Sequence, residues 1–371
     1  EQVNEIPTRG SGWLFDRAEC TNGATAEWNF DKWAILISTT TKTKCSLYFK
    51  QGQIAVDYLN TIASTTDSLL TDGTTDNNLR YVGSNPNNYV SFNNELWRII
   101  GVMNNIETES GETKSLVKII RNDSLGDYSW DSSDSSINDG YGVNEWSQAD
   151  LMQELNNDYL GTVTIGTDGN WYNNNNNSKT AAKPTSTISS EAQNKIESVK
   201  WNLGSPSNNA GSYDSNWTSV SAPTSYARER SNYTGKVCTS GTSCNDTVTR
   251  TSSWTGKIAL MYPSDYLYAT VGGSTTNRQT CLNTKQYGWS DSTVSDCKDN
   301  DWLYNSSSTQ WTLSPYAYSS HANIVFDVYS GGRVIYNRTS GTDAVRPVVF
   351  LKSTIKITGG AGTSTNPYTL G

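Results

Sequence analysis

Short apolar stretches separated by polar turns run along this 371-residue chain. In the first fifty residues, apolar positions gather around Trp13, Trp28 and residues 34–37, and polar turns lie between them. This spacing is typical of short strands joined by turns. A unit of this size buries little apolar surface. The pattern therefore predicts a small β module over residues 1–50.

A different spacing follows the module. In residues 52–63, apolar side chains such as Ile54 and Leu59 recur at helical intervals, and a polar stretch occupies residues 66–78. Helical spacing of this kind predicts a helix. We therefore expect residues 51–78 to be a connector helix followed by a linker.

From Leu79 onward the pattern predicts a larger domain that mixes strands with a few helices. The strand candidates are residues 89–92, 96–103, 116–121, 257–262, 323–329, 333–337, 345–351 and 354–358. One helix is expected after Ser147 and another after Ser189 or Ser190, because serine caps helix N-termini and apolar residues then recur on one face. The apolar positions of the second helix are Ala192, Ile196 and Val199.

Six cysteines occur in the chain as three neighbouring pairs. The pairs are Cys20 with Cys45, Cys238 with Cys244, and Cys281 with Cys297. Six cysteines allow about 15 pairings, but sequence proximity favours these local loops. Local disulfides are typical of secreted chains in an oxidising compartment, and free buried thiols are the alternative. We therefore expect three disulfides and an extracellular or cell-surface location.

Composition narrows the possible partners. The formal net charge is −8 and Lys and Arg do not cluster, which argues against binding to nucleic acid or to an anionic membrane surface. No apolar run approaches the ~20 residues of a membrane span. The chain opens without a signal peptide, so we expect that an export signal was removed or that the start is trimmed. Thirteen Trp and 21 Tyr against six Phe mean that most large side chains carry a polar group.

Catalytic chemistry finds little support in the sequence. The single histidine, His321, lies in a polar context, and no C-x-x-C spacing or nucleotide-binding glycine motif occurs. Acidic residues crowd one region, where paired carboxylates for glycoside hydrolysis and a weak calcium site are alternatives. These residues are Asp127, Asp131, Asp134, Asp139, Glu145 and Asp150. Their Ser, Gly and Asn neighbours favour solvated turns, so we expect no catalytic, cofactor or metal site.

Aromatic residues near the C-terminus offer the best binding hypothesis. Trp302 and Trp311 are expected to fill the domain core, whereas Tyr316 and Tyr318 are expected to be exposed. Exposed Tyr rings beside Asn and Ser are suited to sugar stacking and to protein recognition. Two arginines, Arg98 and Arg346, have apolar neighbours, and we expect them to pair with carboxylates or to cap carbonyls.

Several segments resemble uncharacterised surface proteins of low-GC Gram-positive gut bacteria. These segments are residues 81–90, 92–102, 258–266, 301–304, 311–315, 344–351 and 355–368. The Trp-x-Leu-x-Pro segment, the Gly-rich hairpin and Val-Arg-Pro also resemble the end of formylglycine-generating-enzyme-like C-type lectin folds. The resemblance implies a β-rich α+β fold, with a small disulfide-bridged β module ahead of a C-type-lectin-like domain at residues 79–371. The only cysteines available there for formylglycine-type oxidation, Cys281 and Cys297, are better explained as a bridge.

Two functions compete at this point. In the first, the chain is a non-enzymatic extracellular adhesin that binds a glycan or a host or bacterial surface protein through its C-terminal domain. In the second, it is a structural subunit of an extracellular filament that binds copies of itself through the N-terminal module. The resembling proteins have an earlier strand in this module, so an open sheet edge could accept a strand from another subunit.

Overall fold

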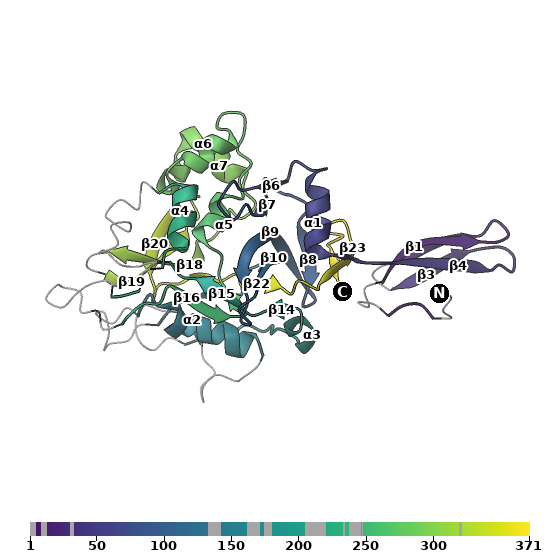
Figure 1. The fold of residues 1–371 in the computed structure, drawn as a ribbon, viewed down its shortest axis with the longest axis horizontal. Helices are drawn as coiled ribbons and strands as arrows, with labels where there is room; N and C mark the ends of the chain where they lie inside the picture. The colour runs from purple at the N-terminus through teal and green to yellow at the C-terminus, as the bar shows by residue number, and fades with distance from the viewer. Residues whose placement is uncertain are drawn as a thin grey trace.

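The computed structural model describes residues 5–8, 13–29, 33–132, 142–161, 171–173, 180–204, 220–232, 234–236, 246, 248–318 and 321–371. Strands make up 38% of the structure and helices 19%, so the β-rich α+β class is confirmed at this coarse level. A narrow β module projects from one end of a larger unit, and the C-terminus lies beside the point where they join (Figure 1).

Two antiparallel ribbons build the module: β1 pairs with β4, and β2 pairs with β3. The bounds are β1 Trp13–Cys20, β2 Thr25–Asn29, β3 Ala34–Ser38 and β4 Cys45–Gln51. The predicted Cys20–Cys45 disulfide is present and joins residues directly opposite each other, with 4.0 Å between their Cα atoms. It closes the end of the ribbon remote from the larger unit, because β4 runs from Cys45 toward that unit.

The module has only a small aromatic core. Phe15 stacks on Trp28 with ring centroids 5.0 Å apart, while Trp33 and Phe49 pack edge-on against Trp28 at 5.2 and 5.7 Å. Among the described residues that precede Gly52, only Trp28 is buried. The disulfide and these ring contacts therefore hold the ribbons together in place of a closed core.

The segment that follows the module belongs to the larger unit. Strand β5 (Gln53–Ile54) pairs with β23 (Lys356–Gly359), and helix α1 (Ala55–Ala63) begins directly after it. Ala55 and Leu59 are buried in the main hydrophobic core. The predicted helix is present, and its apolar side packs into this core. The expected linker also contains a strand, β6, of the central sheet.

An eight-stranded sheet forms the centre of the larger unit. Its strands follow the order β14–β22–β10–β9–β7–β6, with β17 also paired to β22 and β8 to β9. The bounds are β6 Leu69–Thr71, β7 Leu79–Tyr81, β8 Tyr89–Phe92, β9 Glu95–Glu107, β10 Thr113–Arg121, β14 Ile196–Glu197, β17 Ile258–Ala259 and β22 Val348–Leu351. The strands predicted at 89–92, 96–103 and 116–121 are confirmed. The strand predicted at 257–262 is shorter because Pro263 begins a helix.

A five-stranded sheet, in the order β11–β21–β18–β19–β20, carries the candidate site. Its bounds are β11 Asp127–Tyr128, β18 Gln310–Tyr318, β19 His321–Val328, β20 Val334–Arg338 and β21 Asp343–Ala344. The remaining strands are β12 Trp171–Tyr172, β13 Thr180–Ala181, β15 Val199–Asn202, β16 Ser253–Gly256 and β24 Thr369–Leu370. Strand β18 lies between two neighbours, whereas β20 is an edge strand.

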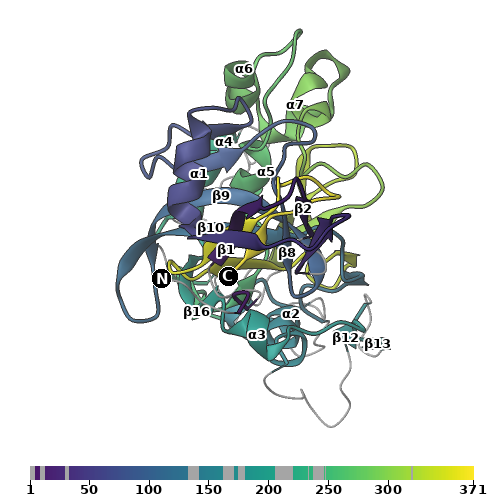
Figure 2. The same cartoon turned by 90° about the vertical axis from the view of Figure 1, so that its right-hand side faces the viewer.

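Short helices cover both sides of the larger unit. They are η2 Trp146–Gln148, α2 Asp150–Gln153, the π-helix η3 Glu154–Tyr159, α3 Ser190–Gln193, α4 Ala222–Glu229, α5 Pro263–Leu267, α6 Arg278–Asn283, η6 Gln286–Ser290, η7 Ser292–Val294 and α7 Asp296–Asp299. Helices α6 and α7 lie on one side of the unit, and α2 and α3 lie on the opposite side (Figures 1 and 2).

The two predicted helix starts have different outcomes. Ser189 caps α3 by accepting a hydrogen bond from the backbone N–H of Ala192, as expected. Ser147 caps no helix, because it lies inside η2 and itself donates to Glu145. The second predicted helix is also too long, because Ile196 leaves α3 to pair with β22.

A paired charge network lies inside the larger unit. Arg80 bonds to Asp72 and Asp265 at 2.8 Å each, and Lys118 also contacts Asp265. All four are buried. Burial lowers the pKa of Lys118 to about 8 although Asp265 opposes the shift. Burial disfavours the ionised Asp265, but the charges of Lys118 and Arg80 outweigh it and lower the pKa of this carboxyl. Each charge has an oppositely charged partner, so loss of one member would leave a buried charge uncompensated.

Candidate functional site

The ligand surface expected at Tyr316 and Tyr318 is not found at Tyr316. This side chain has no exposed area and lies in the hydrophobic core. Tyr316 is buried because β18 has a strand on each side and because the ring of Tyr336, on edge strand β20, stacks over it at 4.9 Å. The predicted exposure of Tyr316 is therefore wrong, and the side chain of Tyr318 lies outside the described residues.

The two tryptophans assigned to the core are confirmed there. Trp302 and Trp311 are buried, and each indole N–H has a backbone acceptor. Trp302 donates to the carbonyl of Tyr81 at 2.9 Å, and Trp311 donates to the carbonyl of Tyr128 at 2.8 Å. Neither ring is available to a ligand.

Two exposed tyrosines and a half-buried arginine form a cluster on the larger unit. Tyr287 on η6 is 37% exposed, and Tyr329, at the end of β19, is 41% exposed. The guanidinium carbon of Arg333 lies 4.6 Å from the Tyr287 ring centroid and 5.1 Å from the Tyr329 ring centroid. We call Tyr287, Tyr329 and Arg333 the tyrosine surface.

A tight turn between β19 and β20 presents two of these three side chains. The backbone N–H of Tyr329 donates to the carbonyl of Arg333 at 2.9 Å, and that of Gly332 donates back to Tyr329 at 2.7 Å. Two tyrosine hydroxyls also bond to the backbone of the turn: Tyr304 donates to Ser330 O at 2.9 Å, and Tyr266 donates to Gly332 O at 2.7 Å. These bonds fix the backbone of the turn at both residues.

Gly332 is the position at which this turn depends on glycine. Its φ of +93° is in the left-handed region, and a Cβ there would lie 2.2 Å from Cδ of Lys298 on α7. A side chain there would adopt an unfavourable backbone conformation and would have to displace the Lys298 side chain. The close approach shows that the turn packs directly on α7.

Tyr287 faces outward because its neighbours on η6 face inward. Trp289 is fully buried and packs against Tyr266 with ring centroids 5.2 Å apart. Gln286 is buried, and its backbone N–H donates to Val220 O at 2.7 Å. In a 3₁₀-helix, residues three apart share a face, so Gln286 and Trp289 anchor the helix while Tyr287 points to solvent.

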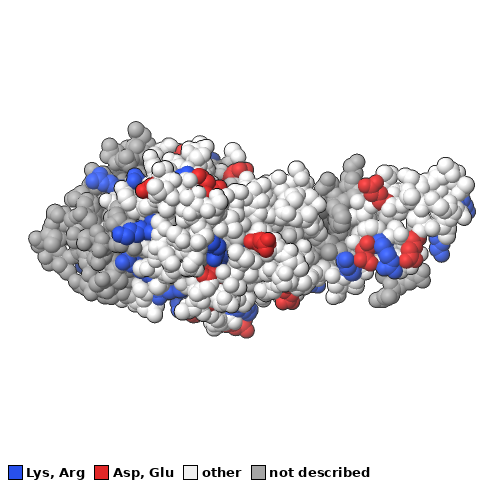
Figure 3. All heavy atoms as spheres, turned by 90° about the horizontal axis from the view of Figure 1, so that it is seen from above, with Lys and Arg blue, Asp and Glu red and all other residues white. Residues whose placement is uncertain are grey.

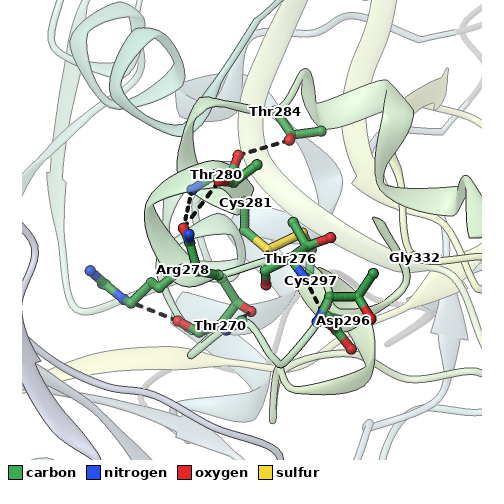
Figure 4. Close-up of a disulfide and its surroundings, with 12 residues drawn as sticks. Thr270, Thr276, Arg278, Thr280, Cys281, Thr284, Asp296, Cys297 and Gly332 are labelled. Carbon is green, nitrogen blue, oxygen red and sulfur yellow. Dashed lines mark hydrogen bonds between the residues drawn. A yellow bond between two sulfur atoms is a disulfide. The ribbon is translucent and has the colours of Figure 1, made fainter. Parts of the chain in front are cut away.

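The predicted Cys281–Cys297 disulfide is present. It supports η6, which carries Tyr287, and α7, on which the turn after Tyr329 packs. It joins α6 to α7, with 5.4 Å between the Cα atoms, and η6 lies within the loop that it closes. Figure 4 shows the bridge beside Thr276, with the Gly332 segment next to α7. Asp296 accepts hydrogen bonds from the backbone N–H groups of Thr275 and Thr276. The third predicted pair, Cys238 with Cys244, lies outside the described residues.

Buried carboxyl groups lie near Arg333. Asp327 on β19 and Asp343 on β21 are both buried. Burial and the neighbouring Asp343 raise the pKa of Asp327 well above its usual range, although Arg333 opposes the shift. Burial likewise raises the pKa of Asp343 to about 7. These groups are enclosed, so a ligand at the tyrosine surface meets aromatic faces and one cation.

The acidic region near residue 130 has a structural role where it is described. Asp131 accepts hydrogen bonds from the backbone N–H groups of Val143 and Asp150 at 2.6 and 3.0 Å. Glu145 accepts from Ser147 and from Thr251. Asp134 and Asp139 lie outside the described residues. Within the described part of the chain, no group of three His, Cys, Asp or Glu side chains could hold a metal ion.

Two cavities in the larger unit are small. One, beside Ser225 and Pro263, has a volume of about 10 Å³, and the other, beside Arg80 and Lys118, has about 20 Å³. A space of that size holds about one water molecule. Small-molecule pockets usually measure several hundred Å³, so these two cavities are not substrate sites.

Two further observations concern the charge on the surface and the length of the helices. On the face in Figure 3, the module carries interleaved acidic and basic side chains, and the described part of the larger unit is mostly uncharged. In the module, Arg17 and Lys50 both pair with Asp16. Among the described residues, the helices are all too short or too polar to cross a bilayer.

Comparison of the chain with protein-family models, with curated proteins and with solved structures gave no match. The C-type-lectin-like arrangement and the resemblance to bacterial surface proteins therefore stay predictions.

One part of the tyrosine surface has a signal in the sequence, although the ligand surface was predicted at Tyr316 and Tyr318. Tyr329 stands directly before Ser330-Gly331-Gly332, a turn sequence between two predicted strands. A large aromatic residue beside such a turn is held at the surface by a rigid backbone. No comparable signal marks Tyr287, because its exposure depends on which face of η6 packs on the core.

Proposed function

We propose that this protein is a non-enzymatic, adhesin-like extracellular protein that binds a carbohydrate through the tyrosine surface. The observation that carries the proposal is the pair of exposed Tyr287 and Tyr329 rings, both of which contact the Arg333 guanidinium. Tyrosine faces stack on the C–H face of sugar rings and lose little conformational entropy, since the side chain has two rotatable bonds. The guanidinium adds donors for hydroxyl or carboxylate groups.

Rigidity supports this assignment. The turn that carries Tyr329 is held by two tyrosine hydroxyls, and η6 is held by buried Trp289 and by the Cys281–Cys297 bridge. A preorganised surface pays less entropy on binding. The two disulfides are compatible with an oxidising, extracellular location.

A glycan microarray probed with the full chain tests the proposal. We expect saturable binding to at least one glycan and at least about a tenfold loss for Tyr329→Ala and for Tyr287→Ala, a loss typical of an aromatic anchor. Tyr48→Ala is the matched control, because Tyr48 is 37% exposed but lies on β4 of the module. Equal binding by all three variants, or no saturable binding by any glycan, would contradict the proposal.

The module favours a second candidate function, assembly into an extracellular filament. Its four strands form two two-stranded sheets, so within the described residues each strand has one edge without a neighbour. Leu36 and Ile37 on β3 are 64% and 40% exposed, and Trp13 on β1 is 40% exposed. Open edges and exposed apolar side chains are suited to strand addition by another copy of the chain.

Negative-stain electron microscopy of the natively secreted protein tests the filament. Regular filaments that disappear in Leu36→Lys would establish assembly through β3. Tyr329→Ala is the control, because a change in the larger unit should leave such filaments intact. Dispersed particles at high protein concentration would remove this candidate and leave the adhesin.

A further inference from the structure

Two buried arginines in the larger unit have no carboxylate partner among the described residues. Arg98 on β9 is 6% exposed, and Arg346, just ahead of β22, is 8% exposed. The sequence led us to expect carboxylate pairs or carbonyl caps for both. The structure shows carbonyl and amide acceptors only. Burial of an unpaired charge is costly, so the arrangement calls for an explanation.

Arg98 is held rigidly between two aromatic rings. Its guanidinium carbon lies 4.2 Å from the Tyr89 ring centroid and 4.5 Å from the Trp302 ring centroid. Its Nε donates to Asn88 Oδ1 at 2.8 Å, and its Nη2 donates weakly to Pro86 O at 3.4 Å. The Nη1 group has no hydrogen-bond partner among the described residues, yet it is not fully enclosed. The rings cover the faces of this fixed guanidinium, so only its Nη1 edge is left for a ligand atom.

Arg346 is held in a similar way. Its Nε donates to Arg121 O and its Nη1 donates to Gln310 Oε1, both at 2.9 Å. Its Nη2 likewise lacks a partner within the described residues and is not fully enclosed. Arg121 pairs with Glu95 and so brings no net charge to the group. Each arginine thus keeps donors for one further acceptor.

The strand register brings the two arginines to the same end of three strands. Arg98 pairs with Ile120 on β10, and Ile120 pairs with Val348 on β22, two residues after Arg346. The positive charge of Arg98 contributes to the lowered pKa of Arg346, for which burial is the larger cause. The hydroxyl of Tyr89 acts electrostatically on both arginines. The register therefore puts Arg98 and Arg346 at the same end of these strands, with Tyr89 directly opposite Arg98 on β8.

Nearby carboxyl groups do not neutralise the pair. The buried carboxyl of Asp301 interacts electrostatically with Arg98. Burial raises the pKa of Asp301 well above its usual range and so favours its neutral form. Its Oδ1 is already occupied by the backbone N–H of Leu303. Asp123, which acts on Arg346, is exposed and screened by solvent. Neither arginine therefore bonds to a carboxylate among the described residues.

We propose that Arg98 and Arg346 form a binding site for an oxyanion, namely the carboxylate, sulfate or phosphate group of a ligand. Paired guanidinium groups match the oxygens of such groups with charge-assisted hydrogen bonds. The Tyr89 ring fixes the first arginine, and its hydroxyl, which bonds to Asn85 at 3.1 Å, borders the site. This inference does not depend on the tyrosine surface.

The test is anion binding by the full chain at constant ionic strength. Isothermal titration and thermal unfolding are measured with sodium sulfate, sodium phosphate and sodium glucuronate against sodium chloride. We expect saturable binding of at least one anion with one site per chain and a rise in Tm that follows the same saturation. A response to glucuronate alone identifies a carboxylate site, and one to sulfate or phosphate alone identifies a tetrahedral anion.

Variants separate a site from a general salt effect. Arg346→Gln and Arg98→Gln should each weaken binding at least tenfold, as loss of one buried charged partner does. Arg346→Lys keeps the charge but loses the planar fork, so it should bind with intermediate affinity. Arg17→Gln, in the module, should bind like the wild type. Without added anion, Arg346→Gln should unfold at a Tm no lower than that of the wild type, because one of two like charges has been removed.

Two results would overturn the inference. Stabilisation by sulfate that never saturates and is equal in all variants would be the general exclusion effect of this salt. A Tm that falls in Arg346→Gln together with unchanged anion affinity would show that Arg346 only caps carbonyl groups.

Discussion

Removal of the Cys281–Cys297 disulfide should destabilise the larger unit and loosen the tyrosine surface. The bridge spans 16 residues in sequence, and the loop-closure model assigns about 3 kcal/mol to a loop of that length. Both cysteines are fully buried, so replacement by alanine also leaves a small cavity. We therefore expect the double variant Cys281→Ala/Cys297→Ala to lose about 3–5 kcal/mol of unfolding free energy.

Guanidinium unfolding followed by tryptophan fluorescence measures the loss, because buried Trp289 lies inside the closed loop. Trypsin cleavage at Lys285, also in that loop, should become faster in the folded variant. The matched control is Cys20→Ala/Cys45→Ala, whose bridge spans 25 residues but lies in the module. The control should leave the main transition of the larger unit unchanged. An unaltered midpoint in the first variant, or equal shifts in both, would refute the reasoning.

Three further predictions concern stability. Asp265→Asn should cost about 3–5 kcal/mol because it leaves buried Lys118 without its carboxylate partner, although Arg80 keeps Asp72. Lys118→Met should cost less, since Asp265 keeps Arg80 as a partner; urea unfolding of both variants checks this order. Burial raises the pKa of Asp343 to about 7, so stability should fall as the pH rises from about 4 to about 7, and Asp343→Asn should flatten that part of the stability–pH profile. A Cβ on Gly101 would lie 1.9 Å from Leu79 O, so Gly101→Ala should lower the Tm and cost at least about 2 kcal/mol; an unchanged Tm would contradict the register of β7 and β9.

Local patterns in the sequence were sufficient for several features of the fold. Two disulfides follow from the spacing of neighbouring cysteines. The buried strands β9 and β10 follow from apolar stretches interrupted only by single charged residues, Arg98 and Lys118, and Ser189 marks a helix start by its capping chemistry. In each case the physical cause lies within a few residues of the feature.

The features that could not be predicted depend on contacts distant in sequence. Tyr316 is buried because β18 is interior to its sheet and Tyr336 stacks over it, and strand order cannot be read from alternation along one strand. Helix α1 packs into the core because β5 pairs with β23, about 300 residues later. Arg98 and Arg346 come to the same end of the sheet through the register of three strands. The candidate sites are therefore products of tertiary pairing.

The most direct test of the central claim is a crystal structure of the chain with the glycan that binds it most tightly on the array. The account predicts a sugar ring stacked on Tyr287 or Tyr329, with an oxygen atom of the ligand within hydrogen-bond distance of the Arg333 guanidinium. A glycan bound at any other surface, with these two rings still open to solvent, would contradict it.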